Sequence, residues 1–539
     1  MKRKIVYMLV LLVLPFTVAR AQEQGQGQGL PEQLTKLLFS ESIITRYYVD
    51  DVDESKVVEA GIKAMLKELD PHSTYSTPDE VKSINEAMRG NFEGIGIQFN
   101  IVDDTLFVIQ TTLNGPSEKA GIMAGDRIIT VNDTAIAGVK MDRGDIMKRL
   151  RGPKGSSVKL EVVRRGLSTP ILFNLIRDKI NTYSVDAAYM VDKKVGYIHI
   201  NSFAATTHQE FVTKLDSLKK RGMKNLILDL QGNGGGFLQA AVDIANEFLE
   251  RGQLVVYTEG RVFPRYEYVA EGGGRFIDGK VAVIVDETSA SASEILAGAI
   301  QDWDRGVVVG RRSFGKGLVQ RAFTLPDGAM IRLTIARYYT PSGRNIQKPY
   351  GDSISYGNDL MERYNRGELV TADSIHFPDS LKMTTKRLGR TVYGGGGIMP
   401  DYFVPLDTNR YTKYHRDIVR RGTMLQTTLR YLDDNREALQ KNYPTMRKFV
   451  NEFVVDEALL GRLRSMAERD SVKLEGGEEE YQRSIPMLSL QMKALLARDL
   501  WDMSEYMEVI NTKDDNFLKA YELLQERNID AVLLKKRKK

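Results

Sequence analysis

The chain has 539 residues, of which 42% are hydrophobic and 27% are charged, values that are ordinary for a globular protein of several domains. Its 76 basic and 71 acidic residues nearly balance, which argues against a nucleic-acid-binding protein because such proteins concentrate positive charge. The absence of cysteine excludes disulfides, cysteine nucleophiles and thiolate metal sites, and the five histidines show no metal-binding spacing.

The N-terminal segment has the pattern of a secretory signal peptide. A basic start is followed by an apolar run, residues 5–18, and by small residues at a cleavage-type spacing that ends at Ala21. The run is shorter than the about 20 residues that a membrane-spanning helix needs. We therefore expect a signal peptide over residues 1–21, a low-complexity linker over 22–29, and a mature chain in the periplasm or outside the cell.

Residues 30–88 are predicted to form a small helical region, because apolar residues recur there near the helical period. The stretch Asp70-Pro71-His72-Ser73 closes its second helix. His72 is interpreted as structural, since a histidine in a helix-ending loop commonly is.

Residues 89–179 are predicted to form a separate small domain of strands and short helices. Its strands are expected at residues 106–110, 126–132 and 157–164, and its helices at 118–120 and before residue 150.

Residues 180–406 alternate strands with helices, as in an α/β domain. A glycine-rich loop, residues 231–236, follows an aliphatic strand at 225–230. Such a loop can cradle phosphate, but no Gly-Lys-Ser/Thr sequence follows it.

The most informative stretch is residues 281–320. An apolar run predicts a buried parallel strand that leads through Ser291 into a helix, residues 295–303. The N–H groups at a helix start are unpaired and favour negative charge, so a serine there can attack a carbonyl while a neighbouring N–H holds the oxyanion. Lys316 lies between two glycines, and if buried it would lose its charge and become a base. Taken alone, Ser291 also fits a helix cap and Lys316 a solvated loop.

Residues 407–539 change to a pattern of helices only, with apolar residues on helical faces. The acidic stretch 475–480 is interpreted as a solvated linker, and the basic end, residues 535–539, as a frayed tail.

These motifs together resemble the carboxy-terminal processing proteases, the tail-specific Ser/Lys endopeptidases. The resemblance is carried by S-A-S-A-S-E at residues 289–294, by F-G-K-G at 314–317 and by the spacing between them. It implies Ser291 as the nucleophile, Lys316 as the base and Gln320 as the residue that orients the base. It also implies a multidomain α/β fold, with a ClpP/crotonase-like catalytic core, an inserted PDZ domain and helical regions at both ends.

The same resemblance assigns the oxyanion hole to the amides of Ala292 and of a glycine in the 231–236 loop, Gly235 or Gly236. Gln231 stands where the family usually has arginine, so the role of that position stays open. Two acidic residues, Glu294 and Asp302, are expected to support the site rather than to react.

Two further motifs, G-I-G-I at residues 94–97 and A-G-D-R-I-I-T-V-N at 124–132, resemble a PDZ domain. The resemblance implies that the amides of Ile95, Gly96 and Ile97 bind the C-terminal carboxylate of a peptide, which adds as a strand to the sheet edge. The plainer alternative is that the glycines only allow a tight turn.

The implied function is a periplasmic or secreted serine endopeptidase that recognises protein tails and cleaves through an acyl-enzyme, with no metal or organic cofactor. A catalytically silent, PDZ-containing scaffold or chaperone is the alternative. The expected partners are proteins or peptides with free C-termini and no nucleic acid, while homo-oligomer formation and an adaptor protein stay open.

Overall fold

The computed structural model describes residues 31–112, 114–351 and 356–534. The expected signal peptide, its cleavage near Ala21, the linker and the basic tail therefore lie outside the described residues. The chain divides into two compact units, residues 1–65 and 66–539. Among the residues described, no helix combines the length and apolar character needed to cross a membrane.

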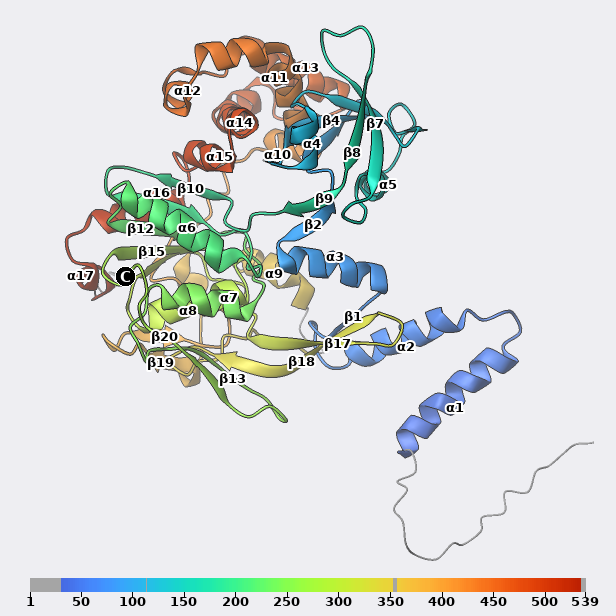
Figure 1. The fold of residues 1–539 in the computed structure, drawn as a ribbon. Coiled ribbons are helices and arrows are strands. Elements are labelled where there is room, and N and C mark those ends of the chain that lie inside the picture. The colour runs from blue at the N-terminus through green and yellow to red at the C-terminus, as the bar shows by residue number, and fades with distance from the viewer. Residues whose placement is uncertain (1–30, 113, 352–355, 535–539) are drawn as a thin grey trace, which may run out of the picture. The chain divides into compact units, whose positions relative to one another are not determined.

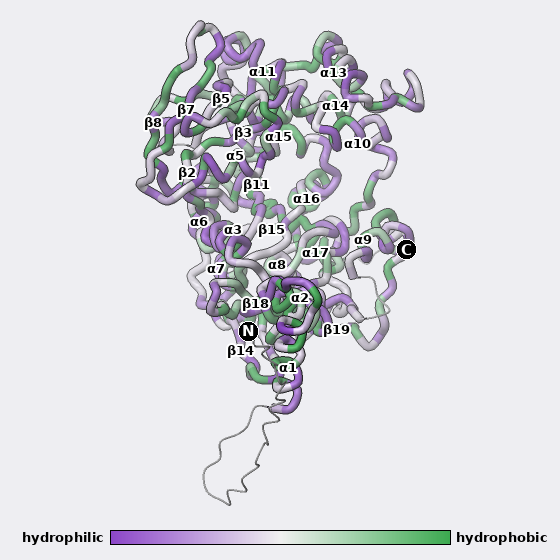
Figure 2. Tube along the Cα trace, turned by 90° about the vertical axis from the view of Figure 1, so that its right-hand side faces the viewer, coloured by the Kyte–Doolittle hydropathy of each residue, from purple (hydrophilic) through white to green (hydrophobic). Residues whose placement is uncertain are grey.

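The first unit contains α1 (Glu32–Tyr47) and most of α2 (Glu54–Lys67). Hydrophilic and hydrophobic residues both occur along α1 (Figure 2). None of the residues of α1, all of them described, is buried. The exposed apolar side chains of this helix include Leu37, Leu38 and Phe39.

A six-stranded sheet forms the centre of the second unit, in the order β10-β11-β12-β15-β16-β21. Neighbouring strands are parallel except for β10, which is antiparallel to β11. The residues from Val281 to Val285 in β15 are all fully buried, which explains why they form a continuous apolar run rather than an alternating one. The strands are β10 (Ala187–Met190), β11 (Val195–His199), β12 (Asn225–Asp229), β15 (Lys280–Val285), β16 (Val307–Gly310) and β21 (Tyr402–Phe403).

Helices cover both faces of this sheet (Figure 1). On one face, α6 (Thr207–Lys220), α7 (Leu238–Asn246) and α8 (Ala292–Asp302) share a core with the inward residues of the strands. On the other face, α16 (Asp515–Gln525) and α17 (Ile529–Leu534) bury apolar side chains such as Phe517 and Leu524. The C-terminal end of the described chain is therefore part of the packing that supports the sheet.

A second sheet carries a hairpin directly after residue 317. The hairpin is formed by β17 (Leu318–Thr324) and β18 (Met330–Tyr339). The sheet also contains β13 (Leu254–Glu259), β14 (Tyr266–Val269) and β1 (Thr74–Ser76). Because β1 pairs with β18, the segment around Asp70 is brought to this hairpin.

The predicted small domain has its own sheet, in the order β3-β4-β5-β7-β8, and its own apolar core. A separate pair of strands, β2 (Asn91–Gly94) and β9 (Asp178–Asn181), joins the two ends of the domain. The domain is preceded by α3 (Pro78–Arg89), which Thr77 and Glu80 cap reciprocally. Its elements are β3 (Ile97–Val102), β4 (Thr105–Thr111), α4 (Pro116–Ala120), β5 (Arg127–Val131), β6 (Thr134–Ala135), α5 (Arg143–Leu150), β7 (Ser157–Val163) and β8 (Ile171–Ile176).

The C-terminal helices form a further apolar core around Phe449, Leu488 and Met492. The prediction of an acidic linker at residues 475–480 was wrong, because Gly477–Leu500 is one helix, α14. Its first turn holds Glu478, Glu479 and Glu480, where negative charge meets the positive end of the helix dipole. The other helices are α10 (Lys413–Arg420), α11 (Thr423–Asn442), α12 (Met446–Glu452), α13 (Glu457–Arg469) and α15 (Met503–Ile510).

The segment between the hairpin β17–β18 and these helices contains short helices and strands. It contains α9 (Asp359–Asn365), β19 (Lys382–Thr384), β20 (Thr391–Tyr393) and the short helices η1 (Tyr356–Asn358), η2 (Ala372–Ser374) and η3 (Asp379–Leu381).

Candidate active site

Ser291 lies in a strained turn between β15 and α8. It is the N-cap residue of α8 and has φ 58° and ψ −112°, a backbone conformation that a residue with a side chain rarely adopts. The flanking serines are fully buried, and their hydroxyls donate to backbone carbonyls: Ser289 to Leu230 at 2.7 Å and Ser293 to Asn233 at 2.9 Å. Ser291 is half-buried, so the outer serines hold the turn and the central one is presented at its bend.

The carboxylate of Glu294 connects this turn to the loop that carries the lysine. Its Oε2 accepts hydrogen bonds from the N–H of Ser291 at 2.8 Å and from the N–H of Lys316 at 2.9 Å. Its Oε1 accepts from the N–H of Gly315 at 2.7 Å and from the hydroxyl of Ser313. Burial raises the pKa of Glu294 to about 7, while these hydrogen bonds act in the opposite direction. One buried side chain therefore fixes the backbone of both predicted catalytic residues.

Tyr338 makes a second connection between the same two segments. Its buried hydroxyl lies within hydrogen-bond distance of the Ser291 carbonyl, at 3.1 Å, and of the Lys316 carbonyl. Tyr338 belongs to β18, so the hairpin as well as α8 holds the pair of segments together.

The environment of Lys316 favours the neutral amine. Burial lowers the pKa of Lys316, and the positive charge of Arg332 lowers it further, whereas the carboxylates of Glu294 and Asp70 raise it. The net direction is downward, which is the direction that a lysine acting as a base requires.

Gln320 lies on β17 at the start of a chain of hydrogen bonds. Its Nε2 donates to the Thr334 hydroxyl at 3.3 Å, and that hydroxyl donates to Oδ1 of Asp70 at 3.1 Å. Among the hydrogen bonds of the described residues, its amide contacts Thr334 and not the lysine amine. The structure thus links Gln320 to Lys316 indirectly, through a carboxylate whose charge acts on the lysine.

The segment that contains Asp70 and His72 is a part of the site that the sequence argument missed. The Asp70 carboxylate also accepts hydrogen bonds from the N–H groups of His72, at 2.8 Å, and Ser73, at 3.0 Å. Burial lowers the pKa of His72 to about 4, and the charge of Lys316 contributes in the same direction. His72 bonds to the Tyr356 hydroxyl at 2.7 Å. The motif was visible in the sequence, but only the pairing of β1 with β18 brings it beside the lysine.

The predicted oxyanion glycines lie against the serine. A Cβ on Gly235 would come within 2.7 Å of the Ser291 Cβ, and one on Gly236 within 2.1 Å of the Phe203 carbonyl oxygen, so a side chain at either position would collide. The Gly235 N–H already donates to the Asn233 side chain at 2.8 Å. Within the part of the chain that the structure describes, the N–H groups of Ala292 and Gly236 donate to no other residue. These two amides are therefore the available donors.

Gln231 connects the oxyanion loop to the C-terminal helix α16. Its N–H donates to Oδ1 of Asp229 at 2.9 Å, and its Oε1 accepts a hydrogen bond from Nδ2 of Asn516 at 2.6 Å. Asn516 is buried. At the position where the resemblance leads one to expect arginine, this chain has a neutral contact between the loop and the last helices.

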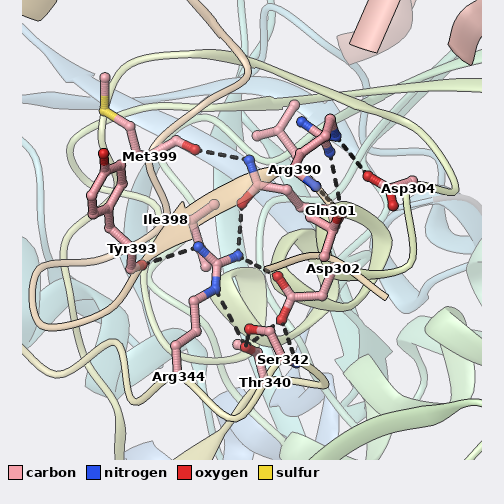
Figure 3. Close-up of polar contacts among 12 residues, drawn as sticks. Gln301, Asp302, Asp304, Thr340, Ser342, Arg344, Arg390, Tyr393, Ile398 and Met399 are labelled. Atoms are coloured by element: carbon pink, nitrogen blue, oxygen red, sulfur yellow. Dashed lines mark hydrogen bonds and ion pairs between the residues drawn. The ribbon is translucent and has the colours of Figure 1, made fainter. Parts of the chain in front are cut away.

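Asp302, at the end of α8, has an entirely buried carboxylate that contacts no reacting group (Figure 3). Its Oδ1 accepts from Nη2 of Arg344 at 2.7 Å, and its Oδ2 accepts from the Ser342 N–H at 2.9 Å and from the Thr340 hydroxyl. These contacts anchor the C-terminal end of the helix whose N-terminus carries Ser291. They fit the supporting role that was predicted for Asp302.

A groove on the small domain contains the three residues predicted to bind a peptide carboxylate, Ile95, Gly96 and Ile97. The N–H groups of Ile95 and Gly96 donate to no other described residue, while both carbonyls accept hydrogen bonds within the domain. The loop therefore presents free amide donors beside the edge of β3, which is the arrangement that carboxylate capture needs.

Comparisons with known families agree with this organisation. Residues 194–352 match Peptidase family S41, residues 94–170 match the PDZ domain, and residues 16–79 match the activating protease CtpB N-terminal domain. Residues 414–502 match a family of unknown function, DUF8443.

Curated relatives are similar over much of their length. The carboxy-terminal processing protease CtpA of Bacillus subtilis is 36% identical over 57% of this chain and 65% of its own length, and CtpB of the same species is 35% identical over 62% and 68%. The carboxy-terminal-processing protease of Bartonella bacilliformis is 30% identical over 69% of this chain and 87% of its own.

Among solved structures, the photosystem II D1 C-terminal processing protease is 29% identical, with a TM-score of 0.33, over 59% of this chain and 91% of its own. The predicted fold class, an α/β peptidase core with a PDZ domain and helical regions at both ends, is confirmed. On the length and identity of these matches, the chain belongs to the carboxy-terminal processing proteases, serine peptidases of family S41.

Proposed function

We propose that this protein is a Ser/Lys endopeptidase that selects protein substrates by their C-terminal tails and cleaves them through an acyl-enzyme. The observation that carries the proposal is the Glu294 carboxylate, which accepts a hydrogen bond from the N–H of Ser291 and from the N–H of Lys316 on one oxygen. These two hydrogen bonds to one buried oxygen hold the backbone of Ser291 close to the backbone of Lys316.

In the proposed reaction, the neutral amine of Lys316 removes the proton from the Ser291 hydroxyl, whose oxygen then attacks the scissile carbonyl carbon. The amides of Ala292 and Gly236 stabilise the negative oxygen of the tetrahedral intermediate, and each such donor is typically worth about 2.7–4 kcal/mol. The N–H of Gly235 could take the place of the Gly236 N–H if its hydrogen bond to the Asn233 side chain were broken. The protonated Lys316 returns its proton to the leaving amine as the C–N bond breaks, and Lys316 then activates the water that hydrolyses the acyl-enzyme.

The PDZ groove would hold the free C-terminus of the substrate while an upstream peptide bond is cleaved. We also propose that the protein acts in the periplasm or outside the cell after cleavage near Ala21, which the N-terminal sequence pattern supports. The exposed apolar side chains of α1 support the further proposal of a homo-oligomer. A protein adaptor that binds the same exposed side chains of α1 would be a second partner.

Replacing either catalytic residue tests the chemistry. Ser291→Ala and Lys316→Ala are each expected to lower the rate of cleavage of a denatured protein with a free tail by at least about 10³-fold, because each removes an indispensable participant. Matched controls are Ser217→Ala and Lys220→Ala, which change exposed residues of α6. Fragments would be quantified by mass spectrometry and folding checked by circular dichroism.

The result that would overturn the proposal is normal turnover in either catalytic variant. A wild-type protein that binds the tail peptide but leaves it intact under all conditions would instead indicate a binding scaffold.

A further inference from the structure

Two walls of different origin enclose the PDZ groove. One side comes from the PDZ domain itself, through the loop at residues 95–97, the strand β3 and the helix α5. The other comes from the C-terminal helices, through Leu425 of α11 and Arg498 of α14. In Figure 1 the helix α11 lies beside the strands of the PDZ sheet. A peptide in this groove would therefore contact both regions.

Apolar packing fixes the second wall in place. Phe107 and Ile109 of the PDZ strand β4 form a buried cluster with Leu429 of α11, and Leu425 packs against it. At the edge of this cluster, Nη2 of Arg127 lies 2.7 Å from Oδ2 of Asp433. Leu429 is 1% exposed, so this contact excludes water. Leu425, one helical turn earlier in α11, lines the groove.

The groove is lined by arginines and by no acidic residue among those described. The arginines are Arg143, Arg151 and Arg498. Arg143 donates to neutral groups, the Asn100 side chain at 3.3 Å and the Phe99 carbonyl at 3.4 Å. Arg151 pairs with Glu86 at 2.8 Å, outside the set of lining residues. Among the described residues, Arg143 is therefore the lining arginine without a carboxylate partner, while Arg151 and Arg498 are each paired with a carboxylate outside the lining set.

Arg498 is held in a defined orientation. Its Nε donates to Oδ1 of Asp499 at 2.7 Å, and the side chain of Asp499 is fully buried. In the described part of the chain, the Arg498 guanidinium makes this one hydrogen bond, and its side chain is 25% exposed. One edge of the guanidinium is thus fixed, and its terminal nitrogens remain as donors for a ligand.

We propose that Arg498 determines substrate specificity by binding an acidic side chain near the free C-terminus of the substrate. The terminal carboxylate of the tail would occupy the amides at residues 95–97, and a second carboxylate, from Asp or Glu within the last few residues, would pair with the guanidinium. This inference rests on the tail recognition proposed above. In this proposal, the helices within residues 414–502, which match a family of unknown function, contribute to substrate specificity.

Peptide binding to the full chain tests the inference. The Ser291→Ala protein prevents cleavage, and three fluorescent peptides are compared: a tail with one Glu among its last four residues, the same tail with Gln, and the Glu tail with an amidated end. We expect the Glu tail to bind about tenfold more tightly than the Gln tail, at the low end of what a charged hydrogen bond contributes. The preference should weaken as salt is added.

The informative variant removes the arginine together with its buried partner. Arg498→Gln alone would leave the Asp499 carboxylate buried and unpaired, so Arg498→Gln is combined with Asp499→Asn. This double variant should bind the Glu and Gln tails with affinities within about twofold of each other, close to the parent's affinity for the Gln tail. Arg483→Gln, an exposed change on the same helix, is the matched control and should keep the preference.

A second variant tests the same inference if the double variant does not fold. Leu425→Glu places a negative charge in the same wall and should weaken binding of the Glu tail more than that of the Gln tail. Equal affinities of the parent for the two tails, or a preference that survives in the double variant, would overturn the role of Arg498 while tail recognition stands. If no peptide with a free C-terminus binds, or the amidated peptide binds equally well, the proposed tail recognition itself fails and this inference with it.

Discussion

At the scale of single residues, the charges around Lys316 decide whether the proposed base is neutral. Burial lowers its pKa, Arg332 adds to that effect, and two carboxylates, Glu294 and Asp70, oppose it. Glu294 holds the backbone of Ser291 and Lys316. Its negative charge also raises the pKa of Lys316, which disfavours the neutral amine. Arg332 opposes these carboxylates by its charge alone, since its side chain makes no hydrogen bond to another described residue.

Neutralising Arg332 should therefore shift the pH dependence of the reaction. In Arg332→Gln the repulsion between two cations is lost, so the charged form of Lys316 becomes easier to keep and its pKa rises. A base works in its neutral form, which dominates above its pKa, so the rising limb of kcat/KM against pH should move to higher pH. We expect a several-fold loss at neutral pH and recovery in alkaline buffer, measured from the pH–rate profile.

Arg337→Gln is the control for this experiment, because Arg337 is exposed on the same strand, β18. A loss of activity in Arg332→Gln that is the same at every pH would mean that Arg332 acts on the structure of the site and not on the lysine charge.

At the scale of elements, local patterns predicted most of what the structure contains. The apolar run at residues 281–285, the small residues after it and the glycines around Lys316 each reflect a local requirement: a strand buried on both faces, a strained turn and close approach of backbones. Hydrogen bonds between distant segments have no such local pattern. The contact of Asp70 with Thr334 and that of Gln231 with Asn516 depend on strand pairing and helix docking, so the sequence could not reveal them.

The contact between α16 and the oxyanion loop leads to a prediction at this scale. Asn516→Leu removes the donor to the half-buried Oε1 of Gln231, at a cost below the about 1–3 kcal/mol that is typical of a fully buried unsatisfied acceptor. The loop that carries Gly235 and Gly236 should then hold its amides less accurately, so kcat should fall about tenfold while KM changes little. Steady-state kinetics on a peptide substrate would measure both values.

Glu522→Gln, on the exposed side of α16, should leave both kinetic constants unchanged. Tail-peptide binding by Asn516→Leu should also be normal, because the PDZ groove does not include this residue. A parallel loss of kcat and peptide affinity would indicate general unfolding rather than a local effect on the loop.

At the scale of the second unit, the PDZ domain and the C-terminal helices are joined by two kinds of contact whose strengths differ. Ion pairs link Arg127 with Asp433 at 2.7 Å and Arg165 with Asp434 at 3.0 Å. The second pair is exposed and the first is partly buried, and ion pairs that keep contact with solvent contribute roughly 0–1 kcal/mol each. The buried Leu429 packs against Phe107 and Ile109 of the PDZ strand β4, and truncation of a buried leucine typically costs about 2–5 kcal/mol. The apolar cluster should therefore dominate the docking.

Hydrogen exchange can compare the two contributions directly. In Leu429→Ala, amides of β4 and α11 should exchange much faster, because the PDZ domain separates more often from the helices. In Asp433→Asn the increase should be small and should disappear at high salt, where the ion pairs of the parent are screened as well. Amides of β12 and β15 in the central sheet should keep their protection in both variants, which shows that the catalytic core remains folded.

The opposite ranking of the two variants would mean that ion pairs hold the second wall of the peptide groove. If Asp433→Asn loosened the contact more than Leu429→Ala, charge and not apolar packing would hold the second wall of the peptide groove. Salt would then release Leu425 and Arg498 from the PDZ domain together, and the preference for acidic tails would vanish at the salt concentration at which the domains separate. If the apolar cluster dominates, salt should weaken that preference only by screening Arg498 itself, while exchange of β4 and α11 stays slow.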